Sequence, residues 1–131
     1  MSRENAEVVR RWFEAFSSED FDAAIALVHR DVVFVPPGNQ APYRGAESLR
    51  RWMEPDAFHD QVADPLETVA VTDRTILARQ HVTGRGRASG MELDTTTWSV
   101  WTFDDDGLIT RIEIYLPHEK EKALEAAGLS E

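Results

Sequence analysis

Residues 100–129 read VWTFDDDGLITRIEIYLPHEKEKALEAAGL, and this stretch decides the fold class. Two strand-like runs, 91–103 and 108–116, flank a polar turn in which Gly107 can adopt a positive φ. The pattern predicts an antiparallel hairpin. A helix is predicted next, over 118–127, because Gly128 is a typical residue just past a helix end.

Two more strands are predicted directly before this hairpin, over 66–71 and 75–83. The segment 84–90, GRGRASG, joins two strands and does not lead a strand into a helix, so it indicates a hairpin loop and not a phosphate-binding loop. Four consecutive strands with short connections indicate an antiparallel meander.

The N-terminal part is mainly helical in its pattern. Helices are predicted over 3–17, 20–29 and 46–54, with one strand over 31–35 that stops at two prolines. Helices in the first half and antiparallel strands in the second indicate an α+β domain, in which helices cover one face of a curved sheet. In the first helix, apolar residues recur at i, i+3, i+4 and i+7, namely Val9, Trp12, Phe13 and Phe16.

Composition limits the possible functions. A chain of 131 residues forms one domain, expected to span 1–131. With 24 acidic and 14 basic side chains, the net charge of −10 disfavours nucleic acid and anionic membranes as partners. The chain has no cysteine, no HExxH-type spacing and no apolar N-terminal segment. No metal or cofactor is therefore expected, and the expected location is cytoplasmic.

Three stretches together resemble a known family. They are VVRRWFEAFSSEDFDAAIALVHRDVVFVPPG at 8–38, PYRGAESLRRW at 42–52, and the stretch at 100–129 quoted above. In their order and spacing they resemble SnoaL-like proteins of the nuclear-transport-factor-two-like superfamily. The resemblance implies a cone, in which a curved antiparallel sheet wraps around N-terminal helices and leaves a central apolar pocket. It also implies a homodimer through the sheet.

The superfamily includes ketosteroid isomerases, and the resemblance implies where their groups would fall. The first proton donor, a tyrosine, falls on Trp12, the aspartate base falls on Pro36, and the second donor falls on Ser99. Proline cannot act as a base, and an indole N–H cannot deliver a proton. The isomerase reaction is therefore not expected.

Polyketide cyclases and limonene-type epoxide hydrolases also belong to the superfamily. Their final-strand aspartate falls on Ile114, and a neighbouring cyclase histidine falls on Ile112. The Arg-x-Asp pair of the hydrolases is matched by Arg79 followed by His81, which is not a carboxylate. The matched positions therefore do not supply either known set of catalytic groups.

Strand register leaves one alternative open, because a shift of one residue exchanges the two faces of a strand. A shift would turn Glu113, Tyr115, Arg79 and His81 inward as an acid–base cluster. It would also turn Ile112, Ile114 and Leu116 outward together, which disfavours it.

The sequence thus predicts a pocket protein that binds an apolar small molecule. One alternative is an enzyme of the same family with Glu113 or His81 as base, and another is an interaction module with a filled core. Pocket walls of such proteins are mostly apolar with a few placed polar groups. The expected ligand-binding residues are Trp12, Phe16, Phe34, Tyr43, Trp52, Gln80, Ser99, Trp101, Ile112 and Ile114.

Overall fold

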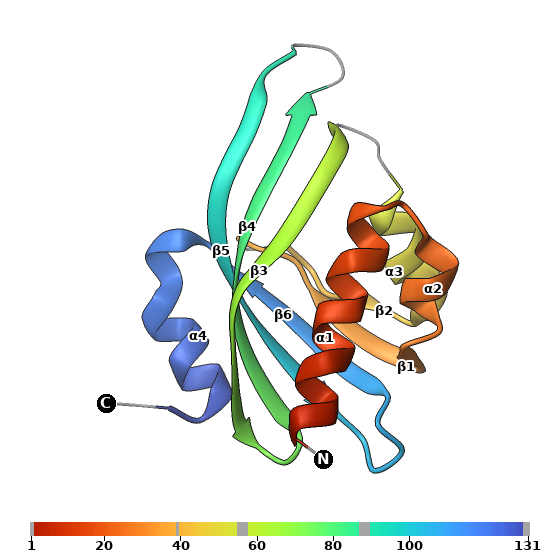
Figure 1. Cartoon of the computed structure of the whole chain (residues 1–131), viewed down its shortest axis with the longest axis vertical. Helices are drawn as coiled ribbons and strands as arrows, with labels where there is room; N and C mark the ends of the chain where they lie inside the picture. Colours follow the sequence, from red (N-terminus) through yellow and green to blue (C-terminus); the bar gives the residue numbers. More distant parts are fainter. Residues whose placement is uncertain (1, 39, 55–57, 87–89, 130–131) are drawn as a thin grey trace.

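A computed structural model describes residues 2–38, 40–54, 58–86 and 90–129. Helices α1 (Ser2–Ser17), α2 (Phe21–Ile25) and α3 (Ala46–Met53) lie on one side of a curved six-stranded sheet, and α4 (Lys120–Ala127) lies on the other (Figure 1). This is the α+β arrangement expected from the sequence. The side that carries α1, α2 and α3 is called the inner face below. The remaining elements are β1 (Val28–Val35), β2 (Tyr43–Arg44), β3 (Phe58–Thr72), β4 (Thr75–Gly86), β5 (Glu92–Phe103), β6 (Ile109–Tyr115) and the short 3-10 helix Pro117–Glu119.

The strands follow the order β2-β1-β6-β5-β4-β3. Strands β3 to β6 form the predicted antiparallel meander. The expectation of a wholly antiparallel sheet needs one correction, because β1 pairs with β6 in parallel. Helix α3 and strands β2 to β5, which lie between β1 and β6 in the chain, provide the long crossover that a parallel pair requires.

Helix α1 forms where the apolar spacing predicts it. Val9, Trp12, Phe13 and Phe16 are all buried, while Glu14 on the opposite side is exposed. The apolar stripe packs on the inner face of the sheet and forms much of its core.

The second helix is shorter than the predicted 20–29. Asp20 caps it, since its side chain accepts a hydrogen bond from the N–H of Ala23. The helix ends at Ile25, and Val28 already pairs with Ile109 in the sheet. A β-branched residue with a strand partner favours the extended form over one more helical turn.

Strand β3 begins at Phe58, well before the predicted start at 66. Pro65 and the polar residues around it do not resemble a strand, so the sequence pattern does not predict the part of β3 before residue 66. However, β3 is an edge strand, where a missing N–H can face solvent. Strand β4 likewise continues past the predicted end at 83, to Gly86. Residues 87–89 of the GRGRASG segment lie outside the described part of the chain.

The turn at 104–107 has the predicted form. Gly107 has a φ of 81°, and the Asp104 carboxylate accepts the N–H groups of Asp106 and Leu108. The strands that this turn joins carry part of the candidate site, including Thr97 and Ile114. The last helix also ends as expected, with Gly128 in the left-handed conformation.

Candidate functional site

A cavity of about 310 Å³ lies between α1, α3 and the inner face of the sheet. Most of its lining is apolar and comes from α1, α3, β1 and the meander. The apolar lining residues are Trp12, Phe13, Phe16, Phe34, Pro37, Trp52, Ala63, Val82, Leu93, Ile114 and Leu116. The polar lining residues are Gln61, Gln80, Thr95 and Thr97, all of them neutral.

The strand pairing settles which residues face the cavity. Ser99 pairs with Ile114, and Trp101 pairs with Ile112, so these four share the inner face. Ile112 and Trp101 are fully buried in the main core, and Ile114 packs against it. The register that keeps the isoleucines inside is therefore the one observed.

Glu113, Tyr115, Arg79 and His81 lie on the outer face of the sheet. Tyr115 belongs to the small apolar cluster under α4. His81 Nε2 lies 2.7 Å from Asp94 Oδ1 on the same outer face. Neither Glu113 nor His81 reaches the cavity, so the geometry does not support the alternative that either acts there as a base.

The ten expected binding residues fall into three groups. Six of them line the cavity, namely Trp12, Phe16, Phe34, Trp52, Gln80 and Ile114. Ser99, Trp101 and Ile112 are fully buried beneath the lining. Tyr43 packs beside Phe34, with ring centroids 6.2 Å apart, and is not among the lining residues.

The sequence reasoning missed several lining residues, above all Thr95 and Thr97. A signal for them exists, because Thr95, Thr97, Ser99 and Trp101 alternate along β5 and therefore share one face. Extending the inward set from Trp101 back along the strand would have found both threonines.

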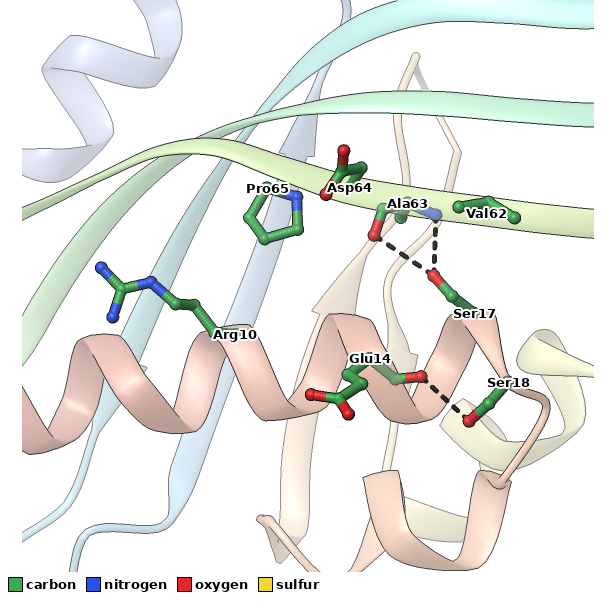
Figure 2. A pocket seen from close by; sticks show the side chains of 8 residues that line it. All are labelled: Arg10, Glu14, Ser17, Ser18, Val62, Ala63, Asp64 and Pro65. Atoms are coloured by element: carbon green, nitrogen blue, oxygen red, sulfur yellow. Dashed lines mark hydrogen bonds between the residues drawn. The ribbon is translucent and has the colours of Figure 1, made fainter.

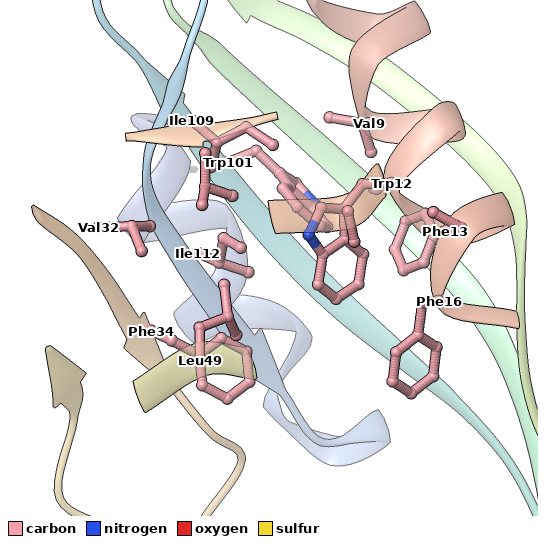
Figure 3. Close-up of a cluster of buried hydrophobic side chains, with 14 of the residues drawn as sticks. Val9, Trp12, Phe13, Phe16, Val32, Phe34, Leu49, Trp101, Ile109 and Ile112 are labelled. Carbon is pink, nitrogen blue, oxygen red and sulfur yellow. The ribbon is translucent and has the colours of Figure 1, made fainter. Parts of the chain in front are cut away.

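Aromatic rings line part of the cavity, and Figure 3 shows Trp12, Phe16 and Phe34 among the buried side chains of the core. Trp12 stacks on Phe16 with centroids 5.6 Å apart and meets Trp101 edge-on at 5.2 Å. Phe34 and Trp52 approach to 4.3 Å. Rings in such contact stabilise each other by about 0.5–1.5 kcal/mol beyond their burial.

A row of hydrogen bonds runs along the inner face beneath and beside the cavity. The Trp101 indole N–H donates to Ser99 Oγ at 2.7 Å, and the Ser99 hydroxyl donates to Gln80 Oε1 at 2.9 Å. Gln80 Nε2 then donates to Thr97 Oγ1 at 2.8 Å. These residues are buried, so the row satisfies polar groups that would otherwise be costly to remove from water.

The Trp12 indole N–H does not join this row. It is fully buried and has no hydrogen-bond partner in the described part of the chain. An unpaired buried donor costs about 1–3 kcal/mol. Because the nitrogen is shielded, Trp12 contributes ring surface to the cavity and no polar contact.

The lining contains no acidic, basic or tyrosine side chain among the described residues. General acid–base catalysis needs a group that can exchange a proton within reach of the substrate. The cavity walls therefore favour binding of a neutral molecule over proton transfer to it.

Among the described residues, the group with the largest change in pKa lies on the outer face. Burial raises the pKa of Tyr115 to about 12, and the hydrogen bond from its hydroxyl to Glu113 Oε2, at 2.9 Å, adds to the effect. The folded protein thus holds this proton more tightly than the unfolded chain does. The resulting stabilisation is complete below pH 10 and is lost as the pH rises towards 12.

We expect the Tyr43→Phe variant, which keeps only Tyr115, to form tyrosinate with a midpoint near pH 12. Absorbance at 295 nm measures this directly, with far-ultraviolet circular dichroism to show that the chain is still folded. The Tyr115→Phe variant is the control that removes the signal. A midpoint near 10, the ordinary value, would contradict the buried environment.

A second hollow lies outside the cone, between α1 and the edge strand β3 (Figure 2). Ser17 Oγ accepts the Ala63 N–H at 3.0 Å and donates to the Ala63 carbonyl at 3.2 Å. Arg10 reaches Thr68 of the same strand. These hydrogen bonds hold α1 against β3, so we assign the residues of this hollow a structural role.

Comparisons with known proteins agree with this geometry. A family model described as the SnoaL-like domain matches residues 9–112. A search of curated proteins gave no match.

Solved structures give the same fold. A candidate polyketide cyclase from Sinorhizobium meliloti, protein SMa1630, is 30% identical over 87% of this chain and 98% of its own, with a TM-score of 0.69. The epoxide hydrolase/cyclase-like enzyme SalBIII is 15% identical over 88% and 94%, with a TM-score of 0.80. RV0760c from Mycobacterium tuberculosis, in complex with estradiol-17beta-hemisuccinate, is 15% identical over 85% and 92%, with a TM-score of 0.75.

Proposed function

The chain belongs to the SnoaL-like domain family, and from that premise we propose that it is a small-molecule-binding protein whose cavity holds an apolar ligand. The observation that carries the proposal is the lining of the 310 Å³ cavity, which is aromatic and aliphatic with a few neutral polar groups. Cavities of about 300 Å³ or more with such walls are typical ligand sites. A cavity of this size also speaks against the filled-core alternative.

Two of the similar structures are consistent with a ligand in this fold. RV0760c was solved with estradiol-17beta-hemisuccinate, and another similar structure, 15% identical with a TM-score of 0.73, is a computationally designed 17-OHP binder. Both ligands belong to those proteins. For this chain, the proposal specifies only an apolar molecule that fits the aromatic walls.

Fluorene, a flat tricyclic hydrocarbon, is a suitable probe because it offers only apolar surface. We expect it to bind once per chain with a Kd of about 10–100 µM, since it buries its surface against rings that are already in place. Quenching of tryptophan fluorescence follows the titration, because Trp12 and Trp52 line the cavity.

A matched pair of variants locates the binding. Val82 lines the cavity, and its neighbour Thr83 points to the other face of β4. Val82→Trp fills the cavity and is expected to abolish fluorene binding, whereas Thr83→Trp adds the same ring outside and retains it. Equal binding by the two variants, or no binding by the unaltered protein, would contradict the proposal.

The homodimer expected from the sequence also stays a proposal, supported by apolar surface on the outer face of the sheet. Val69 pairs with Leu77, which lies under α4, yet Val69 itself remains 39% exposed. Sedimentation equilibrium is expected to give a dimer mass, and Val69→Lys is expected to shift it towards the monomer. A monomer mass for the unaltered chain would contradict this part of the proposal.

A further inference from the structure

The hydrogen-bond row beside the cavity has a fixed direction. An indole nitrogen can only donate, so Ser99 Oγ must accept from Trp101. The Ser99 hydroxyl then donates to Gln80, which fixes the carbonyl oxygen of that amide towards Ser99 and its nitrogen towards Thr97. Thr97 therefore stands at the accepting end of the row.

The row of hydrogen bonds uses the oxygen of the Thr97 hydroxyl but not its hydrogen. Thr97 is 7% exposed and lines the cavity. Its oxygen takes the Gln80 N–H, and within the described segments no protein acceptor receives its hydrogen. A buried hydroxyl in this state is stabilised by an acceptor that arrives from the cavity.

We propose that Thr97 donates a hydrogen bond to an acceptor oxygen of the ligand, so that the ligand class is a neutral, apolar molecule with a carbonyl or ether oxygen. The inference rests on the proposed function, because it concerns the polar contact inside the same cavity. It makes Thr97 the residue that sets the orientation of the ligand.

The surroundings of Thr97 favour an acceptor over any other ligand group. An ammonium or other donor-only group could donate to the second lone pair of the Thr97 oxygen, but it would leave the Thr97 hydrogen without an acceptor. A carboxylate would be an acceptor, but the lining offers no cation to offset the loss of its hydration. A neutral oxygen satisfies the hydroxyl without that penalty.

The row beneath Thr97 strengthens this contact. Hydrogen bonds in a chain polarise one another, so a hydroxyl that accepts on one side becomes a better donor on the other. Three successive bonds, from Trp101 through Ser99 and Gln80, point the same way and end on Thr97. Thr95 also lines the cavity, but no such row leads to it.

The test compares fluorene with 9-fluorenone, which has the same tricyclic skeleton and one added carbonyl oxygen. The ketone is expected to bind about 3–10-fold more tightly, the value of one net neutral hydrogen bond. In Thr97→Val the preference is expected to disappear while the affinity for fluorene stays within about twofold. Thr96→Val, which makes the same change on the outer face of β5, is the matched control and is expected to keep the preference.

Thr97→Val also leaves the Gln80 amide without its acceptor, so a second variant and a second measurement are needed. Thr97→Ser keeps the hydroxyl and is expected to keep the preference for the ketone. In the unaltered protein, the infrared carbonyl band of bound 9-fluorenone is expected to move to lower wavenumber than in cyclohexane, because donation weakens the C=O bond.

The outcomes separate the two proposals. Binding of both probes with equal affinity, or a carbonyl band unchanged from cyclohexane, would overturn the role of Thr97 while the proposed function stands. A preference for the ketone that survives in Thr97→Val would overturn it as well. Binding of neither probe would count against the proposed function itself.

Discussion

Replacing Trp101 with alanine is expected to lower the free energy of unfolding by about 3–5 kcal/mol, the usual range for deleting a fully buried tryptophan. Trp101 is completely buried, and its ring lies 5.2 Å from Trp12 and 5.3 Å from Phe13, centroid to centroid. Alanine would leave a void between α1 and the sheet that these rings can only partly close. It would also remove the first donor of the row that runs through Ser99.

The control is Trp98→Ala on the other face of the same strand. Trp98 is half-buried in the cluster under α4, with Lys120 Nζ 5.5 Å from its ring centroid. Its loss is expected to cost about 1–2 kcal/mol, because less apolar surface is removed. Urea unfolding followed by circular dichroism measures both variants. A loss for Trp101→Ala no larger than for Trp98→Ala would contradict the position of Trp101 in the core.

The elements with strict periodicity could be predicted from the sequence, and those shaped by their neighbours could not. Helix α1 and the β5–β6 hairpin follow their apolar spacing and turn residues closely. The early start of β3 escaped prediction because Pro65 is acceptable only where the strand is at an edge. Edge position is a property of the whole sheet, which no local pattern contains.

The residues of the candidate site likewise include some that could be predicted from the sequence and some that could not. The aromatic wall could be predicted because Trp12, Phe16 and Phe34 are large and lie at inward positions. Thr95 and Thr97 were missed because threonine is common on both faces of a strand, so its type does not indicate its direction. Tyr43 was also expected in the site, but its ring packs beside Phe34 and is not among the lining residues.

The size of the cavity is a different kind of property. It is the small space that remains after the side chains of α1, α3 and the sheet have packed. The cavity volume is the difference between the volume that the helices and the sheet enclose and the volume that their side chains fill. Both are much larger than the cavity, so a shift of one ring changes it substantially. Residue types can therefore indicate which side chains line such a cavity, but they do not determine whether the cavity is open.

A carboxylate in the cavity wall tests whether water hydrates the cavity. The Gln80→Glu variant introduces one, and its free energy of unfolding is expected to depend strongly on pH. Gln80 is 1% exposed, and its side-chain amide forms hydrogen bonds with both Ser99 and Thr97. Glutamate has nearly the same shape, but ionising it there would bury a charge with no cation in the lining. Burial should hold its pKa in the folded state well above the unfolded value of about 4.3.

The sign follows from proton binding. Above pH 4.3 the unfolded chain loses the proton while the folded protein keeps it, so the free energy of unfolding falls as the pH rises. The slope approaches about 1.4 kcal/mol per pH unit until the pH reaches the raised pKa of the folded state. Between pH 5 and 7 the variant should therefore lose about 2–3 kcal/mol relative to the unaltered protein.

Gln40→Glu supplies the matched control, because Gln40 is exposed and the same substitution there meets solvent. Urea unfolding at several pH values is expected to show the steep decline for Gln80→Glu and almost none for Gln40→Glu. If the two variants instead follow the same shallow curve, water must hydrate the carboxylate at position 80. The cavity would then be a wet site, and an apolar ligand would gain much less from entering it.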